Sequence, residues 1–188
     1  CATQAVNLSP PDSPDRAGRL NNLAVRFADR WHRDGDPADL NTAIDCATQA
    51  VNLSPPDSPD RAGLLNNLAN RFADRWHRDG NGQDVEAAVR LWRAALASAK
   101  DRDVSAVLRA AERLARVTLV TGPWHVCAEA AEIAVRQVRE MVGAFGSARA
   151  SHWLGQVQGL AADGAYAYAQ QGRLVEAVSL IERGLGVL

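Results

Sequence analysis

Apolar residues recur along this chain at intervals of three and four, the spacing of one face of an α-helix. Two such stripes follow each other within the first 53 residues, and each predicts a helix. The stripe between positions 14 and 33 consists of Leu20, Leu23, Ala24, Phe27 and Trp31. The stripe between positions 40 and 53 consists of Leu40, Ala43, Ile44, Ala47, Ala50, Val51 and Leu53.

Glycine, proline and short polar residues mark where these helices begin and end. Ser13-Pro14 and Asp36-Pro37 each predict an N-cap followed by a proline in the first turn. Gly35 is expected to end the first helix. The segment SPPDSPD, at 9–15 and again at 54–60, cannot continue a helix and predicts a rigid turn. Two antiparallel helices with short connections therefore form one unit.

The chain contains this unit twice, because residues 46–90 repeat residues 1–45. Over the first 35 residues the copies differ at only two positions, Arg19/Leu64 and Val25/Asn70. A fixed period of this kind indicates a repeat architecture. The near-identity has two interpretations: a recent duplication, or two copies that present the same surface to a ligand.

The second half continues the helical pattern without repeating the sequence. We predict helices at 84–99, 103–121, 123–143, 148–171 and 173–186, with breaks at Gly122-Pro123, at 145–147 and at Gly172. The predicted fold class is all-α: a right-handed α-solenoid of about nine helices. It comprises two 45-residue repeats over 1–90, the first truncated at its start, and divergent hairpins over 91–188 that lead to a missing C-terminal domain.

The repeat resembles the tetratricopeptide repeat (TPR), a helix-turn-helix motif with small and bulky residues at set places. Leu23, Ala24 and Phe27 suit its first helix, and Ala43, Ala47, Ala50 and Pro55 suit its second. The next copy matches through Leu68, Ala69, Phe72 and Ala88, and the C-terminal part through Tyr168, Gly172, Ala177, Ile181 and Gly184. The unit is 45 residues long, against about 34 in that family.

A narrower resemblance covers nearly the whole chain. The units with PPDSPDRAG and LNNLA, and the closing segment at 159–188, are similar to long repeats found upstream of CHAT domains, which are caspase-like protease modules. This resemblance implies that the chain is the recognition or regulatory arm of such a protease. The protease's own His and Cys motifs do not occur in this chain.

Composition narrows the classes of function. The chain has 188 residues, a net charge of −1, 35 alanines and a single lysine. Near-neutrality argues against nucleic acid as a partner. The chain has no run of 18 apolar residues, so the sequence predicts no membrane span. The high alanine content is typical of closely packed helices. The sparse cysteines suit a reducing compartment, so we expect a cytoplasmic location.

Residues that could carry chemistry form no recognisable active site. Cys1 and Cys46 hold the same place in successive repeats, roughly 10 Å apart, which exceeds disulfide reach. With Cys127 they are expected to be small buried packing residues. His125 and Cys127 point to different helix faces, and no metal or cofactor motif accompanies them. A hydrolase using Cys127 with His152 is the remaining enzymatic alternative.

The first helix of each unit carries two further stripes beside its apolar one. Arg19, Arg26, Arg30 and Arg33 form a stripe that we expect to be solvated. The other corresponds to the concave groove where TPR proteins bind peptides; its members are Gly18, Asn21, Val25, Asp29 and His32 in one copy, and Gly63, Asn66, Asn70, Asp74 and His77 in the other. Asparagine suits this task, because its amide offers a donor and an acceptor to an extended backbone. The alternative is a merely solvated polar face.

The sequence therefore predicts a non-enzymatic scaffold that binds a protein or peptide, with an associated caspase-like domain as a further partner. Five tryptophans could form a stacking platform, but Trp31 and Trp76 align with the apolar stripes and predict packing between helices. Self-association through the ends of the solenoid is an alternative function.

Overall fold

The computed structural model describes residues 13, 15–99, 103–145 and 147–186, with the backbone alone for 145 and 147–152. The described residues form eight α-helices and contain no strand. The ninth expected helix, like Cys1, falls within residues 1–12 and lies outside the described part. Contacts divide the chain into two units, residues 1–94 and 95–188.

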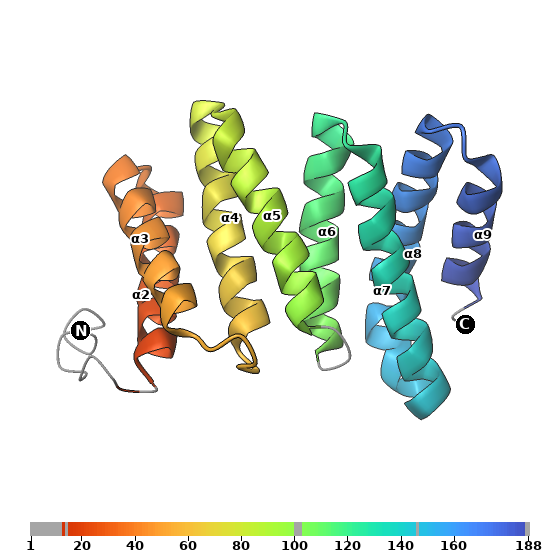
Figure 1. Ribbon diagram of the computed structural model, residues 1–188, viewed down its shortest axis with the longest axis horizontal. Coiled ribbons are helices and arrows are strands. Elements are labelled where there is room, and N and C mark those ends of the chain that lie inside the picture. The colour runs from red at the N-terminus through yellow and green to blue at the C-terminus, as the bar shows by residue number, and fades with distance from the viewer. Residues whose placement is uncertain (1–12, 14, 100–102, 146, 187–188) are drawn as a thin grey trace. The chain divides into compact units, whose positions relative to one another are not determined.

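The first unit consists of two helical hairpins. Helices α2 (Arg16–Asp34) and α3 (Pro37–Leu53) form the first, and α4 (Arg61–Asp79) and α5 (Gly82–Ala99) form the second. Helix α5 extends past the unit boundary. Helix α4 packs against α3 and also contacts α2 (Figure 1). First helices of successive repeats therefore lie side by side, as the repeat pattern predicts.

Most of the predicted helix boundaries are confirmed. Gly35 ends α2 and Gly80 ends α4, with left-handed φ angles of 75° and 71°, and each donates its N–H to a carbonyl four residues earlier. Asp36 caps α3 by accepting a hydrogen bond from the N–H of Ala38 at 2.9 Å, and Pro37 occupies the first helical position. A left-handed glycine and a capped proline thus determine the sharp turn of the hairpin.

The expectation that Ser13 caps α2 is wrong. The helix begins at Arg16 with Asp15 as its N-cap, and the N–H of Arg16 donates to the carbonyl of Ser13 at 3.0 Å. In the second copy Ser58 accepts from the N–H of Asp60 at 3.3 Å, one turn ahead of α4. The serine therefore closes a turn before the helix, because hydroxyls bond readily to an N–H two residues on.

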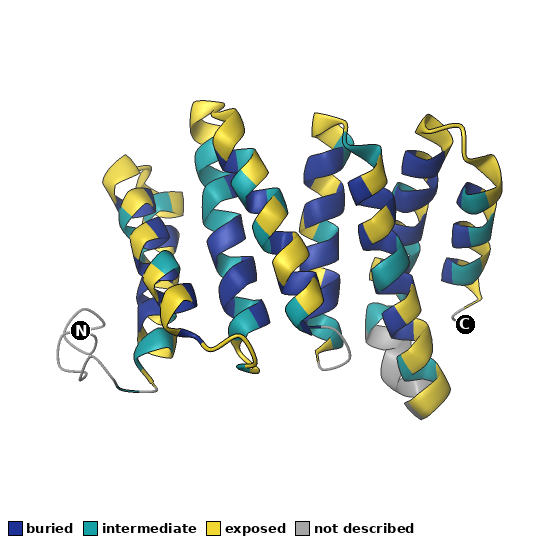
Figure 2. Cartoon of the chain, in the orientation of Figure 1, coloured by how far each residue is buried: buried dark blue, intermediate teal, exposed yellow. Residues whose placement is uncertain are grey.

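The core of the first unit follows the predicted apolar faces (Figure 2). The predicted residues of α2 and α3 are buried, except that Phe27 and Trp31 are half-buried and Leu53 is 48% exposed. The assignment of Leu53 to the core is wrong, because it is the last residue of α3 and faces a cavity described below. Trp92 of α5 is almost completely buried. Trp31 and Trp76 are half-buried, and each ring lies against the adjacent histidine.

The second unit also consists of two hairpins: α6 (Val104–Thr121) with α7 (Trp124–Phe145), and α8 (Ser147–Gln170) with α9 (Leu174–Leu185). Helix α7 packs along α8 and joins the hairpins. The predicted breaks are confirmed: Gly122 and Gly172 have left-handed φ angles of 97° and 74°, and α8 begins two residues after α7 ends. No described helix combines the length and apolar character needed to cross a membrane.

Glycine permits close helix packing in the second unit. A Cβ placed on Gly164 of α8 would lie 2.4 Å from the Cβ of Ala131 and 2.7 Å from Cδ2 of Leu180. A Cβ on Gly184 of α9 would lie 2.5 Å from that of Ala161. Both distances are too short for real atoms, so only glycine fits at these crossings. The alanine-rich composition has the same cause, since close backbones need small side chains between them.

Candidate functional site

The two copies of the predicted groove stripe differ in exposure. On α2, Gly18, Val25, Asp29 and His32 are exposed and Asn21 is half-buried. On α4, only His77 is exposed; Gly63, Asn70 and Asp74 are half-buried and Asn66 is buried. The same residues therefore have different surroundings in the two repeats, so the copies do not present two equivalent surfaces.

The stripe residues of α2 contact the next repeat. The Nδ2 of Asn67 donates to the Oδ1 of Asn21 at 2.8 Å, across 46 residues of sequence. Near the other end of the helices, Nε2 of His32 lies 3.7 Å from Oδ2 of Asp74, which is also 3.5 Å from Nε of Arg71. Polar contacts between repeats thus use part of the stripe that was expected to face a ligand.

Two predicted residues of α4 are partly or wholly enclosed by the protein. The Oδ1 of Asn70 accepts a hydrogen bond from the indole Nε1 of Trp92 at 3.2 Å. Asn66 is only 6% exposed, and among the described residues its Oδ1 has no hydrogen-bond partner. Neither side chain is displayed on an open surface.

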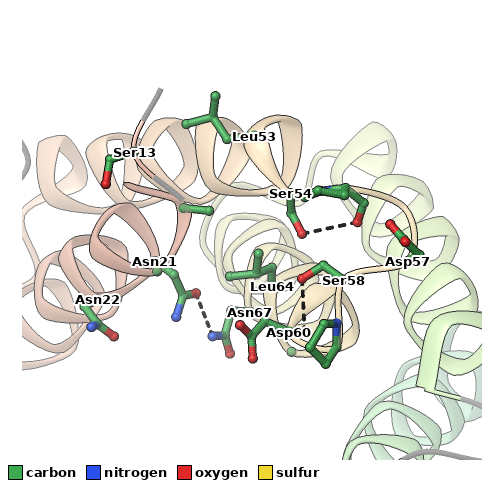
Figure 3. Close-up of a pocket in the computed structure, with 15 residues that line it drawn as sticks. Ser13, Asn21, Asn22, Leu53, Ser54, Asp57, Ser58, Asp60, Leu64 and Asn67 are labelled. Atoms are coloured by element: carbon green, nitrogen blue, oxygen red, sulfur yellow. Dashed lines mark hydrogen bonds between the residues drawn. The ribbon is translucent and has the colours of Figure 1, made fainter. Parts of the chain in front are cut away.

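A cavity of about 850 Å³ lies where the N-terminal ends of α2 and α4 meet the turn after α3 (Figure 3). Of the predicted stripe it includes Gly18, Asn21 and Gly63. Its volume is within the range typical of ligand pockets, about 300–1,000 Å³. The complete lining consists of Ser13, Ala17, Gly18, Asn21, Asn22, Leu53, Ser54, Pro55, Asp57, Ser58, Pro59, Asp60, Gly63, Leu64 and Asn67.

The cavity combines three kinds of chemistry. Asn21, Asn22 and Asn67 supply amide groups on one side, and Figure 3 shows Asn21 and Asn67 turned toward each other. Leu53 and Leu64 supply apolar surface. The ionised side chains in the lining are two carboxylates, those of Asp57 and Asp60. Such a site can bond to a peptide backbone, cover an aliphatic side chain and attract a cation.

Sequence reasoning missed most of this lining. Asn22, Asn67, Leu53 and Leu64 were outside the predicted stripe. The available signal was the doublet Asn21-Asn22, which recurs as Asn66-Asn67. One helix face cannot hold two consecutive residues, so a period-based stripe selects only the first of each doublet.

An arginine–aspartate pair joins the two helices of each hairpin in the first unit. Arg75 donates from Nε and Nη2 to the carboxylate of Asp84 at 2.8 and 2.6 Å, joining α4 to the start of α5. Arg30 makes the same two-bond contact with Asp39, and this hydrogen bonding lowers the pKa of Asp39. Arg30 is exposed, as expected for its stripe, and it also bonds to Asp39. The sequence could have predicted both pairs, because an aspartate follows each arginine by nine residues, across the turn of the hairpin.

A third arginine fixes the turn that lines the cavity. Arg61 donates from Nη1 to the backbone carbonyls of Val51, at 3.1 Å, and Ser54. These carbonyls belong to the end of α3, where the Val51 carbonyl also accepts the N–H of Ser54 at 3.2 Å. The contact therefore ties the proline-rich turn to the first turn of α4 and preforms one wall of the cavity.

The surroundings of Cys127 are unfavourable for a nucleophile. Its side chain is completely buried, its Sγ lies 3.7 Å from the carbonyl oxygen of Asp163, and burial raises the pKa of its thiol to about 11. A nucleophilic cysteine needs a lowered pKa and access to substrate. Cys46 is also buried, as predicted. The side chain of His152 lies outside the described residues. In the described ranges, no three His, Cys, Asp or Glu residues are grouped to hold a metal ion.

Comparisons with known proteins relate the chain to helical repeat structures. No family model matches the sequence, and no curated protein matches it. Among solved structures, BtubC (BKLC) from P. vanneervenii has a TM-score of 0.67 at 17% identity, over 99% of this chain and 70% of that one.

Two further structures show the same likeness. A Podosopora anserina putative kinesin light chain with nearly identical TPR-like repeats has a TM-score of 0.60 at 21% identity, over 99% and 81% of the two chains. MamA has a TM-score of 0.57 at 17% identity, over 99% and 84%. These identities establish the fold alone: the chain is an all-α helical repeat protein of the TPR-like solenoid type.

Proposed function

We propose that this chain is a non-enzymatic interaction scaffold, and that the cavity between α2 and α4 binds a peptide segment of a partner protein. The observation that carries the proposal is the pair of amides from successive repeats at the edge of that cavity. TPR-like neighbours support the scaffold class through their common fold.

The amide pair has unused hydrogen-bonding capacity. Asn21 uses its Oδ1 and Asn67 uses one Nδ2 hydrogen in their mutual bond. The Nδ2 of Asn21 and the Oδ1 of Asn67 make no hydrogen bond with any described residue. One donor and one acceptor side by side match the C=O and N–H groups that an extended peptide presents along its edge. The mutual bond also orients both side chains, which reduces the entropy that binding must overcome.

Alanine variants test this role directly. A phage-displayed library of random twelve-residue peptides is selected on the whole chain, and the affinity of selected peptides is measured by fluorescence polarisation. Asn21→Ala and Asn67→Ala should each weaken binding at least tenfold, since each removes hydrogen bonds in a partly desolvated site. Asn41→Ala, at an exposed position of α3 outside the cavity, is the matched control. Equal affinities for all three variants would reject the cavity as the binding surface.

A second candidate function is self-association through α9, which carries an exposed apolar strip. The strip consists of Leu174, Val178, Ile181 and Leu185. On α7, by contrast, Ala128 and Ala131 are buried, and Gly164 of α8 packs against them. We infer that a second copy of the chain covers the α9 strip. Its spacing of four, three and four is unchanged when reversed, so two copies of α9 can pair antiparallel with matched contacts.

Sedimentation equilibrium at tens of micromolar tests the self-association. The intact chain should sediment as a dimer and Val178→Asp as a monomer, because a buried carboxylate opposes apolar pairing. Val120→Asp places the same charge at an exposed valine of α6, outside the strip, and should leave the dimer intact. A monomeric intact chain would refute this assignment.

We further propose that the chain serves as the regulatory arm of a CHAT protease-like protein. The support is the resemblance of the 45-residue units and of the segment 159–188 to repeats that precede such domains. The sequence that follows Leu188 in the gene tests it. A caspase-like His and Cys pair there would establish the association, and a continuous gene product without them would remove it.

A further inference from the structure

We infer that the cavity between α2 and α4 selects a basic peptide, with an aliphatic side chain on the Leu64 floor and a lysine or arginine beside Asp57 and Asp60. The inference rests on the proposed function and adds the class of ligand. Three independent features of the lining carry it: two open glycines, an apolar floor present in one copy only, and carboxylates as the ionised groups.

The glycines leave space for a ligand backbone. Gly18 and Gly63 lie within helices, have no positive φ, and have no atom of a described residue within 4 Å of the place where a Cβ would be. Neither backbone conformation nor helix packing therefore calls for glycine here, in contrast to Gly164. Glycine makes a helix less stable than alanine does. At a cavity wall, a missing side chain lets another backbone approach closely.

The apolar floor distinguishes the second repeat from the first. Leu64 is 5% exposed and lines the cavity, with the half-exposed Leu53 beside it. The equivalent residue of the first repeat, Arg19, has a side chain that is 43% exposed, and its guanidinium lies 4.0 Å from Asp15. One of only two differences across 35 aligned residues thus supplies a leucine to this cavity. An aliphatic ligand side chain would cover Leu53 and gain apolar contact with both leucines.

The charge of the lining specifies a cation. Asp57 and Asp60 lie on the turn that forms one wall, and no Lys or Arg belongs to the lining. The nearby Arg61 is directed to the carbonyls of Val51 and Ser54. Because the ionised groups of the lining are carboxylates, they would repel an acidic ligand and attract a lysine or arginine. Because both carboxylates face solvent, salt should screen this attraction.

Peptide selection tests the ligand class. The same random twelve-residue phage library is selected on the intact chain, and enriched sequences are compared with the unselected library. We expect a lysine or arginine within about three residues of Leu, Ile or Val, matching a cavity of this size. Asp57→Asn with Asp60→Asn should weaken the selected peptides about three- to tenfold and remove most of the salt dependence.

Gly63→Ala separates binding from folding. This change should raise the melting temperature, because alanine favours helix, and should weaken peptide binding more than tenfold, because its methyl group occupies the approach path. Gly82→Ala, at the exposed start of α5 outside the cavity, is the control and should leave binding unchanged. Leu64→Arg, which installs the residue of the first repeat, should also abolish binding while circular dichroism reports intact helices.

The outcomes distinguish this inference from the proposed function. Enrichment of acidic or uncharged peptides whose binding depends on Asn21 and Asn67 would overturn the ligand class and leave peptide binding intact. Unchanged affinity in Gly63→Ala would likewise overturn the role of the open glycine. Failure to enrich any peptide would overturn both proposals together.

Discussion

The clamp between Arg75 and Asp84 makes a quantitative prediction about what holds a repeat together. Asp84 lies in the first turn of α5 with its side chain 5% exposed, and it accepts two hydrogen bonds from Arg75, whose side chain is 28% exposed. Arg75→Ala removes both bonds and leaves a carboxylate in a site that water barely reaches. The cost should therefore exceed that of a surface ion pair.

The size of the expected loss in unfolding free energy follows from the burial of Asp84. Breaking a fully buried pair costs about 3–5 kcal/mol, and a hydrogen bond to a charged group contributes about 1.5–3 kcal/mol. The partial exposure of Arg75 lets water enter when it is removed, and the N-terminus of α5 continues to stabilise the charge. We therefore expect Arg75→Ala to lower the free energy of unfolding by about 2–3 kcal/mol.

Urea unfolding at pH 7, followed by circular dichroism, measures this loss in a double-mutant cycle of Arg75→Ala and Asp84→Ala. The coupling energy should be about 2 kcal/mol, because each single change already removes the whole contact. The control pair is Arg78 and Asp79, which are neighbours in sequence and make the same two-bond contact, but with the carboxylate 43% exposed; Arg78→Ala should leave stability unchanged. A loss below about 0.5 kcal/mol for Arg75→Ala, the level of a surface pair, would refute the reasoning.

Three further predictions concern packing and titration. Gly164→Ala should destabilise the chain by about 1–3 kcal/mol, since its Cβ would overlap Ala131, whereas Gly159→Ala, with open space around it, should leave melting unchanged or raise it. The pKa of Cys127 is raised to about 11, so the folded state resists ionisation; stability should be complete below pH 9 and fall between pH 9 and 11 in urea titrations, and Cys127→Ala should remove this slope. The pKa of Asp39 is lowered by Arg30, so its contribution should be present above pH 4 and lost as pH falls below it; an unchanged acid-unfolding profile in Arg30→Ala would contradict this.

The helices were predictable because their ends depend on local chemistry. Gly35, Gly122 and Gly172 adopt the left-handed conformation that ends a helix, and Pro37 follows a capping aspartate. Each signal acts within a few residues, so no knowledge of the fold is needed to interpret it. The predicted boundaries of the second half accordingly agree with the observed helices to within two residues. The prediction of Ser13 as the N-cap of α2 was wrong because serine favours turns as well as helix caps.

The site was predictable only in part, because it depends on how repeats meet. The hydrogen bond between Asn21 and Asn67 joins residues 46 positions apart, and no periodicity within one helix specifies such a register. Asn21 and Asn66 have nearly the same sequence neighbours, yet one lines a cavity and the other is buried. Their difference arises from what lies on either side of each helix, which a helix pattern does not contain.

The two substitutions between the repeats are explained by their different surroundings. Asn70 replaces Val25, and its Oδ1 accepts the hydrogen bond of the buried Trp92 indole, whose equivalent 45 residues earlier is Ala47. A buried indole N–H needs an acceptor, so the tryptophan and the asparagine belong together, as alanine and valine do in the other copy. Leu64 replaces Arg19 where the cavity needs an apolar floor. The duplicated stripe is therefore one sequence in two environments, and the cavity beside it is asymmetric, because its amides come from both repeats and its leucines from the second alone.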